Sequence, residues 1–90
     1  MDVPPPLLLR IARIGLRLSQ EELADAAGVS PRTISKLESN VKIRLETLLR
    51  IKVALEGYGV RFIFKSEHRG FGLRFAPDWP ESIYQSQEVE

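Results

Sequence analysis

Two short helices joined by a tight turn restrict the fold of this chain more than any other feature. Ser19 and Glu22 form a capping box, in which the serine hydroxyl accepts the N3 amide and the glutamate accepts the N-cap amide. Gly28 ends this helix after about eight residues, since glycine enters the left-handed C-terminal conformation without strain. Ser30 and Pro31 then supply an N-cap and an N1 residue, so another helix starts at once. So short a link excludes an antiparallel pair and forces the helices to cross steeply.

Helical and then alternating patterns flank these two helices. Apolar residues spaced by four, three and four predict an earlier helix over about 6–17, with one apolar stripe: Leu7, Ile11, Ile14 and Leu18. A later helix is predicted over about 45–57. Beyond it, apolar residues alternate with other residues, and the polar five-residue connection 66–70 predicts a β-hairpin. The fold class is therefore mainly α, with four to five helices, a C-terminal hairpin and a short flexible tail.

Composition excludes several classes of protein. The chain has 90 residues, no cysteine and one histidine, which rules out disulfide-stapled folds, zinc fingers and thiolate chemistry. No apolar run approaches the roughly 18 residues of a membrane span, and the start lacks the basic region of a signal peptide. We expect a cytoplasmic protein with no membrane partner, catalytic centre, cofactor or metal. Residues 1–75 hold 13 basic and 8 acidic residues, which favours a polyanionic partner.

The segment 18–38 resembles the helix-turn-helix of Cro-like and xenobiotic-response-element (XRE) type repressors of phages and bacteria. Seven residues occupy the positions that this pattern requires: Gln20, Leu23, Ala24, Gly28, Val29, Ile34 and Leu37. The resemblance covers about residues 7–57 and implies a lambda-repressor-like domain. It implies a dimeric, sequence-specific regulator of transcription, most simply a repressor and not an enzyme. Such a regulator, of bacterial or phage type, binds a double-stranded DNA operator at the nucleoid.

The second helix of the motif, about 31–38, has one polar side. Plotted at 100° per residue, that side holds two cations, two hydroxyl residues and no acid: Arg32, Ser35, Lys36 and Ser39. Arg and Lys can donate to guanine O6 and N7 in a major groove, and Ser can approach closely. The resemblance assigns base reading to Arg32, Thr33 and Lys36, with a phosphate contact as the alternative for Thr33, and we add Ser35. Pro31 departs from the polar residue often found at its position.

Phosphate contacts are expected at both ends of the motif. The resemblance assigns one to Gln20, where helix-end amides assist. We add four further residues as phosphate contacts: Ser30, Ser39, Lys42 and Arg44. Arg44 replaces the small N-cap residue that is usual in the family, and the loop before it is somewhat short.

Glu38 projects near the apolar side of its helix, where an unpaired carboxylate is costly. The resemblance pairs it with Arg13 across the first and third helices. We therefore expect a structural ion pair.

We divide the chain into a DNA-binding domain (1–59), a hairpin extension (60–76) and an acidic, mobile tail (77–90). An isolated hairpin is only marginally stable, so its apolar face needs a cover. Three alternatives are packing on Leu49 and Val53, pairing with a second copy, and a wing that contacts DNA. We favour a dimer interface through six residues: Val60, Phe62, Phe64, Phe71, Leu73 and Phe75.

Two other functions remain open at this point. In the first, the chain is the antitoxin of a toxin–antitoxin operon, which autoregulates through the helix-turn-helix and binds a toxin through its C-terminal part. In the second, it is an interaction module without DNA binding. Trp79 either docks on the body or anchors a protein partner.

Overall fold

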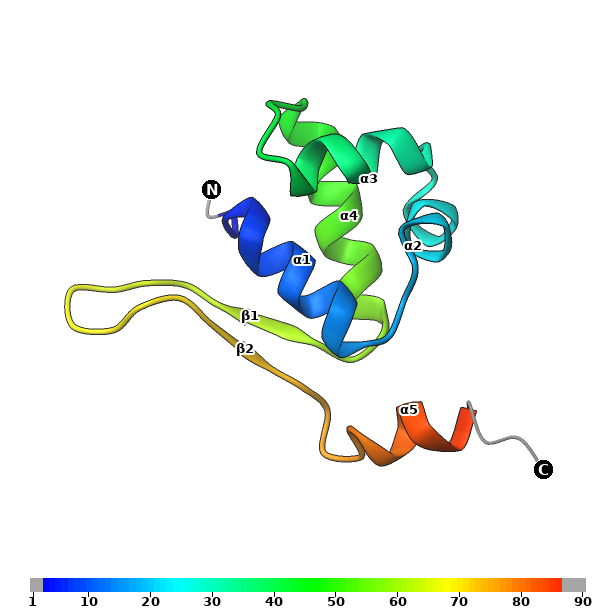
Figure 1. Cartoon of the computed structure of the whole chain (residues 1–90). Helices are drawn as coiled ribbons and strands as arrows, with labels where there is room; N and C mark the ends of the chain where they lie inside the picture. The colour runs from blue at the N-terminus through cyan, green and yellow to red at the C-terminus, as the bar shows by residue number, and fades with distance from the viewer. Residues whose placement is uncertain (1–2, 87–90) are drawn as a thin grey trace.

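Four helices form the body of the molecule, and a hairpin and a fifth helix follow them (Figure 1). The structure is a computed structural model that describes residues 3–86. Its elements in chain order are α1 (Pro6–Gly15), α2 (Gln20–Ala27), α3 (Pro31–Glu38), α4 (Leu45–Gly57), β1 (Arg61–Ile63), β2 (Gly72–Arg74) and α5 (Glu81–Ser86). The strands pair antiparallel, with Phe62 opposite Leu73. The predicted fold class, mainly α with a C-terminal hairpin, is confirmed.

The caps that the sequence predicts set the ends of α2 and α3. The Ser19 hydroxyl accepts the Glu22 amide at 2.9 Å, and the Glu22 carboxylate accepts the Ser19 amide at 2.8 Å. Gly28 ends α2 with φ of 69°, in the left-handed region. The Ser30 hydroxyl accepts the amide of Thr33 at 3.2 Å and so caps α3. These local contacts fix the steep turn between the two helices.

Helix α1 ends two residues before its predicted end. Arg17 adopts φ of 56°, its amide donates to the Ile14 carbonyl at 3.0 Å, and the Leu18 amide donates to the Arg13 carbonyl at 3.1 Å. This pair of backward bonds is a Schellman motif, in which the left-handed residue is usually glycine. The sequence has arginine at this position instead of the glycine that would indicate a helix end, so the predicted helix extended to residue 17.

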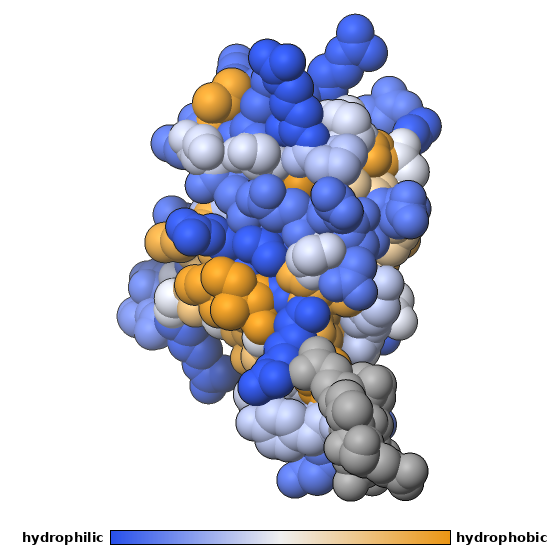
Figure 2. Space-filling view, turned by 45° about the vertical axis from the view of Figure 1, so that its right-hand side comes forward, coloured by the Kyte–Doolittle hydropathy of each residue, from blue (hydrophilic) through white to orange (hydrophobic). Residues whose placement is uncertain are grey.

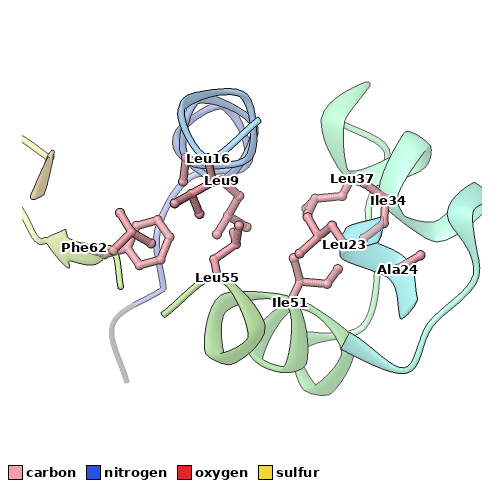
Figure 3. Packing of buried hydrophobic residues seen from close by; sticks show 11 residues of the cluster. Leu9, Leu16, Leu23, Ala24, Ile34, Leu37, Ile51, Leu55 and Phe62 are labelled. Atoms are coloured by element: carbon pink, nitrogen blue, oxygen red, sulfur yellow. The ribbon is translucent and has the colours of Figure 1, made fainter. Parts of the chain in front are cut away.

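The core lies on the other side of α1 from the stripe that the sequence analysis predicted. Leu7, Ile11 and Ile14 are 64%, 47% and 54% exposed. The core cluster consists of eleven residues: Leu9, Ala12, Leu16, Leu23, Ala24, Ile34, Leu37, Ile51, Leu55, Val60 and Phe62 (Figure 3). The prediction is wrong because α1 has two apolar sides and periodicity does not choose between them. When the side that contains the small Ala12 packs on the core, Arg13 also comes to lie next to Glu38.

The hairpin packs on its own chain. Val60 is 0% and Phe62 8% exposed, and Phe62 points toward Leu9 and Leu55 (Figure 3). Both therefore belong to the core, and their prediction as dimer contacts is wrong. This is the alternative in which the hairpin packs on its own chain, although Val53, which we named as part of that cover, is left exposed.

The other four hairpin residues of the predicted interface are less buried. Phe64, Leu73 and Phe75 are partly buried against the core, whereas Phe71 is exposed. The strands are only three residues long, so the connection between them is longer than the predicted five residues. A dimer role for these four residues stays a prediction.

The segment after the hairpin is folded onto the end of α1. The Trp79 ring stacks on Phe75 with centroids 4.2 Å apart, and its Nε1 donates to the Gly15 carbonyl at 2.8 Å. Phe75 also lies so close to Gly15 that a Cβ there would be 2.6 Å from its ring. The expected mobile tail is therefore corrected for residues 77–86, because aromatic stacking and this hydrogen bond hold the segment. Residues 87–90 lie outside the described part.

Candidate nucleic-acid interface

Helix α3 presents its polar side to solvent. Arg32, Ser35 and Lys36 are exposed, whereas Ile34 and Leu37 are buried beneath them. Figure 1 places α3 and the α3–α4 loop at the top of the molecule, and Figure 2 shows mostly hydrophilic residues there. The polar arc predicted from helical periodicity is therefore present on the surface. Ser39, at the C-terminal end of the arc, is exposed as well.

Four cations around α3 have no partner within residues 3–84, whose side chains the structure describes. Arg32, Lys36, Lys42 and Arg44 form no hydrogen bond or ion pair with that part of the chain. No acidic residue of α3 faces outward, since Glu38 is turned toward α1. This region thus holds a positive charge that the described chain does not neutralise, which is what a polyanion requires.

A hollow between α3 and the start of α4 collects three of these cations. Its lining is Thr33, Lys36, Lys42, Ile43, Arg44 and Thr47. Arg44 occupies the N-cap of α4 without a side-chain cap bond, so the first amides of α4 remain available to an anion. Thr47 was missed by the sequence analysis. Its signal in the sequence is its place three residues after Arg44, an N-cap residue whose side chain cannot accept hydrogen bonds.

Two predicted phosphate contacts also have structural partners. Gln20 Nε2 donates to Glu38 Oε1 at 3.1 Å. The Ser30 hydroxyl caps α3 and forms a hydrogen bond of 2.9 Å with the Thr33 hydroxyl. Both side chains are therefore ordered by the fold before any ligand arrives. Their contacts with phosphate stay predictions, as do the roles of Ser39, Lys42 and Arg44.

The expected ion pair joins α1 to the end of α3. Arg13 Nε and Nη2 donate to the two Glu38 carboxylate oxygens at 2.6 and 2.9 Å, and Arg13 Nη1 donates to the Leu18 carbonyl at 2.7 Å. The side chains of Glu38 and Arg13 are only 6% and 14% exposed. This bidentate geometry is the strong form of an arginine–carboxylate contact.

The protonation of Glu38 follows from these neighbours. Burial raises the pKa of its carboxyl, but hydrogen bonds from Arg13 and Gln20 and the charges of Arg13 and Arg10 lower it by more. The net result is a pKa below the usual value, so Glu38 stays ionised at neutral pH. The pair therefore fixes α3 against α1 as a charged unit.

The helix-turn-helix family model matches residues 9–58, which is more than half of the chain. The chain therefore belongs to the helix-turn-helix family of the XRE type, and it is a DNA-binding regulator of transcription. The matched segment contains α2, α3 and the hollow, whereas the hairpin and α5 lie beyond it. A comparison with curated proteins finds no match. None of the described helices has the length and apolar character needed to cross a membrane.

Proposed function

We propose that this protein is a dimeric, sequence-specific repressor that inserts α3 into the major groove of an operator. The observation that carries the proposal is the outward side of α3, where Arg32 and Lys36 have no partner within residues 3–84. Long cations on a rigid helix can reach base edges, and each good bidentate contact with guanine discriminates by about 1–3 kcal/mol. We assign base reading to these two residues, with Ser35 and Thr33 beside them.

The hollow at the start of α4 supports a separate role in phosphate binding. Lys42 and Arg44 lie beside Lys36 in this hollow, and open helix-end amides add a positive dipole. Phosphate contacts set the register of a protein on the duplex, whereas base contacts specify the sequence. The hollow would therefore hold the DNA strand that borders the groove read by α3.

Two recognition helices about 34 Å apart are needed to read both half-sites of an operator in one complex, which is why we propose a dimer. Repression is the simpler mode of regulation, because a repressor needs only to occupy a promoter to exclude polymerase. We place this action in the cytoplasm, at the nucleoid.

The antitoxin alternative shares the same DNA interface and adds a protein partner at the C-terminal part. It has less support, because Val60, Phe62 and Trp79 are engaged with the chain's own helices. A toxin would need another surface.

Selection of bound sequences from a random duplex pool tests the proposal. We expect enrichment of a two-fold symmetric site and, by fluorescence anisotropy, binding to it at least 10³ times tighter than to random duplex at physiological salt. The matched control is the Arg32→Ala/Lys36→Ala variant, which should enrich no site. Equal affinity for all duplexes, with the wild-type chain folded, would reject sequence-specific reading.

A further inference from the structure

Helix α1 is apolar on two opposite sides. Leu9, Ala12 and Leu16 are buried in the core. The three residues that we call the outer stripe lie on the other side, within an arc of about 60° on a helical projection: Leu7, Ile11 and Ile14. Each is about half exposed or more. A helix that is apolar on both sides is normally covered on both sides, so the outer stripe indicates an interface.

The outer stripe contains no charge of its own. Arg10 is the charged residue beside it, and its Nε lies 4.0 Å from Glu38 Oε1, on the side of α1 that meets α3. The stripe therefore has no charged side chain with which an oppositely charged partner could pair. The side chains of the stripe itself do not repel a second copy, and the half-exposed Arg10 at its border is partly neutralised by Glu38.

The spacing of the outer stripe makes it self-complementary. Leu7 precedes Ile11 by four residues and Ile14 follows it by three, so reversing the helix superimposes the stripe almost on itself. We propose that the outer stripe is the centre of a twofold interface between two copies of this chain, with their α1 helices antiparallel. Ile11 then meets Ile11 of the second copy, and Leu7 meets Ile14. This proposal deepens the proposed function, because it names the surface that holds the dimer together.

The interface must extend beyond three side chains. A stable interface buries roughly 800 Å² on each partner, more than three half-exposed residues supply. Strand β2 lies beside α1 and leads to the exposed Phe71, so the flank of the hairpin can add apolar area next to the stripe. A twofold contact of this kind is isologous, with the same patch used on both copies.

The DNA interface stays open in this arrangement. Helix α1 meets α3 through Arg13 and Glu38, which lies on a different side of α1 from the outer stripe. A second copy packed on the stripe therefore leaves Arg32 and Lys36 exposed. Oligomerisation and DNA reading can thus be tested separately.

The chain has no cysteine, which permits a site-specific crosslinking test on the full-length protein. Variants Ile11→Cys, Leu7→Cys, Ile14→Cys and the control Val53→Cys each place one thiol on an exposed apolar position. With a short bismaleimide, we expect Ile11→Cys to form covalent dimers at least tenfold faster than Val53→Cys. An equimolar mixture of Leu7→Cys and Ile14→Cys should crosslink faster than either variant alone.

Sedimentation equilibrium provides a second, independent measurement. We expect the wild-type chain to be a dimer, Ile11→Glu to weaken dimerisation at least tenfold, and Val53→Glu to leave it unchanged. We expect both variants to fold because both sites are exposed, and thermal unfolding checks this. The proposal is overturned by a wild-type monomer at millimolar concentration, by an Ile11→Glu variant as dimeric as wild type, or by Ile11→Cys crosslinking no faster than Val53→Cys. The duplex selection decides sequence reading independently, so the two proposals can fail separately.

Discussion

Helix α3 carries charged residues on two sides, in opposite surroundings. On the inward side, Glu38 is nearly buried and accepts hydrogen bonds from Arg13 and Gln20. On the outward side, Arg32 and Lys36 are exposed and have no partner within residues 3–84. A buried charge without partners is too costly to retain, whereas an exposed one costs little. The first side therefore serves folding, and the second remains available to an external anion.

This difference predicts that removing a charge changes stability on one side of α3 and DNA affinity on the other. Charge removal on the inward side should lower stability and leave the sequence preference of the folded fraction unchanged. Charge removal on the outward side should lower affinity and leave stability unchanged. The four predictions below test this separation.

The largest effect is expected from Arg13→Met. The substitution leaves the Glu38 carboxylate buried without its main partner, which costs about 3–5 kcal/mol, a large part of the stability of a small domain. Thermal and urea unfolding measure the loss. The matched control is Arg32→Met, the same change on the outward side, which should stay within about 0.5 kcal/mol of wild type.

A double-mutant cycle with Glu38→Leu then isolates the pair. The Arg13→Met/Glu38→Leu chain should lose clearly less than the sum of the two single losses, because neither charge is stranded. Strictly additive losses would show that the two side chains do not stabilise each other.

The next effect is the loss of affinity in Arg32→Ala and Lys36→Ala. Each should weaken binding to the selected operator by about 1–3 kcal/mol and relax the preference at one base pair in each half-site. Binding to random duplex should change little, and the melting temperature should stay within a few degrees of wild type. Repeating the duplex selection with each variant identifies the relaxed position. An unchanged sequence preference would remove that residue from the base-reading set.

A smaller and uniform effect is expected from Lys42→Ala and Arg44→Ala. Each removes one of the phosphate contacts that we propose at the hollow, so affinity should fall about equally for operator and random duplex. The slope of log K against log salt should flatten by roughly one unit for each variant. Anisotropy titrations over a salt series measure the slope. A loss confined to the operator would instead place that residue among the base readers.

The smallest effect concerns pH and the inward side alone. The pKa of Glu38 is lowered in the folded protein, so its contribution to stability is present above the unfolded pKa of 4.5 and is lost as pH falls through the folded pKa. The free energy of unfolding should therefore decline below pH 4.5. Glu38→Gln should show a shallower decline over the same range. Identical slopes for the two chains would assign the acid sensitivity to other carboxylates.

Local signals in the sequence predicted the helical part well. Three of these signals act through neighbours within about four residues, so they can be recognised in a single sequence: the Ser19 capping box, Gly28 and the Ser30–Pro31 start of α3. The polar arc of α3 follows from the same 3.6-residue period. The pairing of Arg13 with Glu38 is a contact between distant residues and rested on the family resemblance instead.

Errors arose where the outcome depends on packing between distant segments. Periodicity alone could not decide which apolar side of α1 faces the core. The position of the hairpin depends on the packing of Phe62 against Leu9 and Leu55. The position of Trp79 depends on a hydrogen bond to Gly15, 64 residues away. A two-residue error at the end of α1 came from Arg17, which takes a conformation that glycine usually occupies.

The central claim, that the outward side of α3 reads DNA sequence, is tested most directly by one ratio. The ratio is the dissociation constant for random duplex divided by that for the selected operator, measured by anisotropy at fixed salt. It should fall roughly 30-fold or more in Arg32→Ala/Lys36→Ala, which removes the two base contacts that we propose. It should stay near wild type in Lys65→Ala/Arg69→Ala, which removes two exposed cations from the hairpin connection. An equal fall in both double variants, or none in the first, would contradict the account.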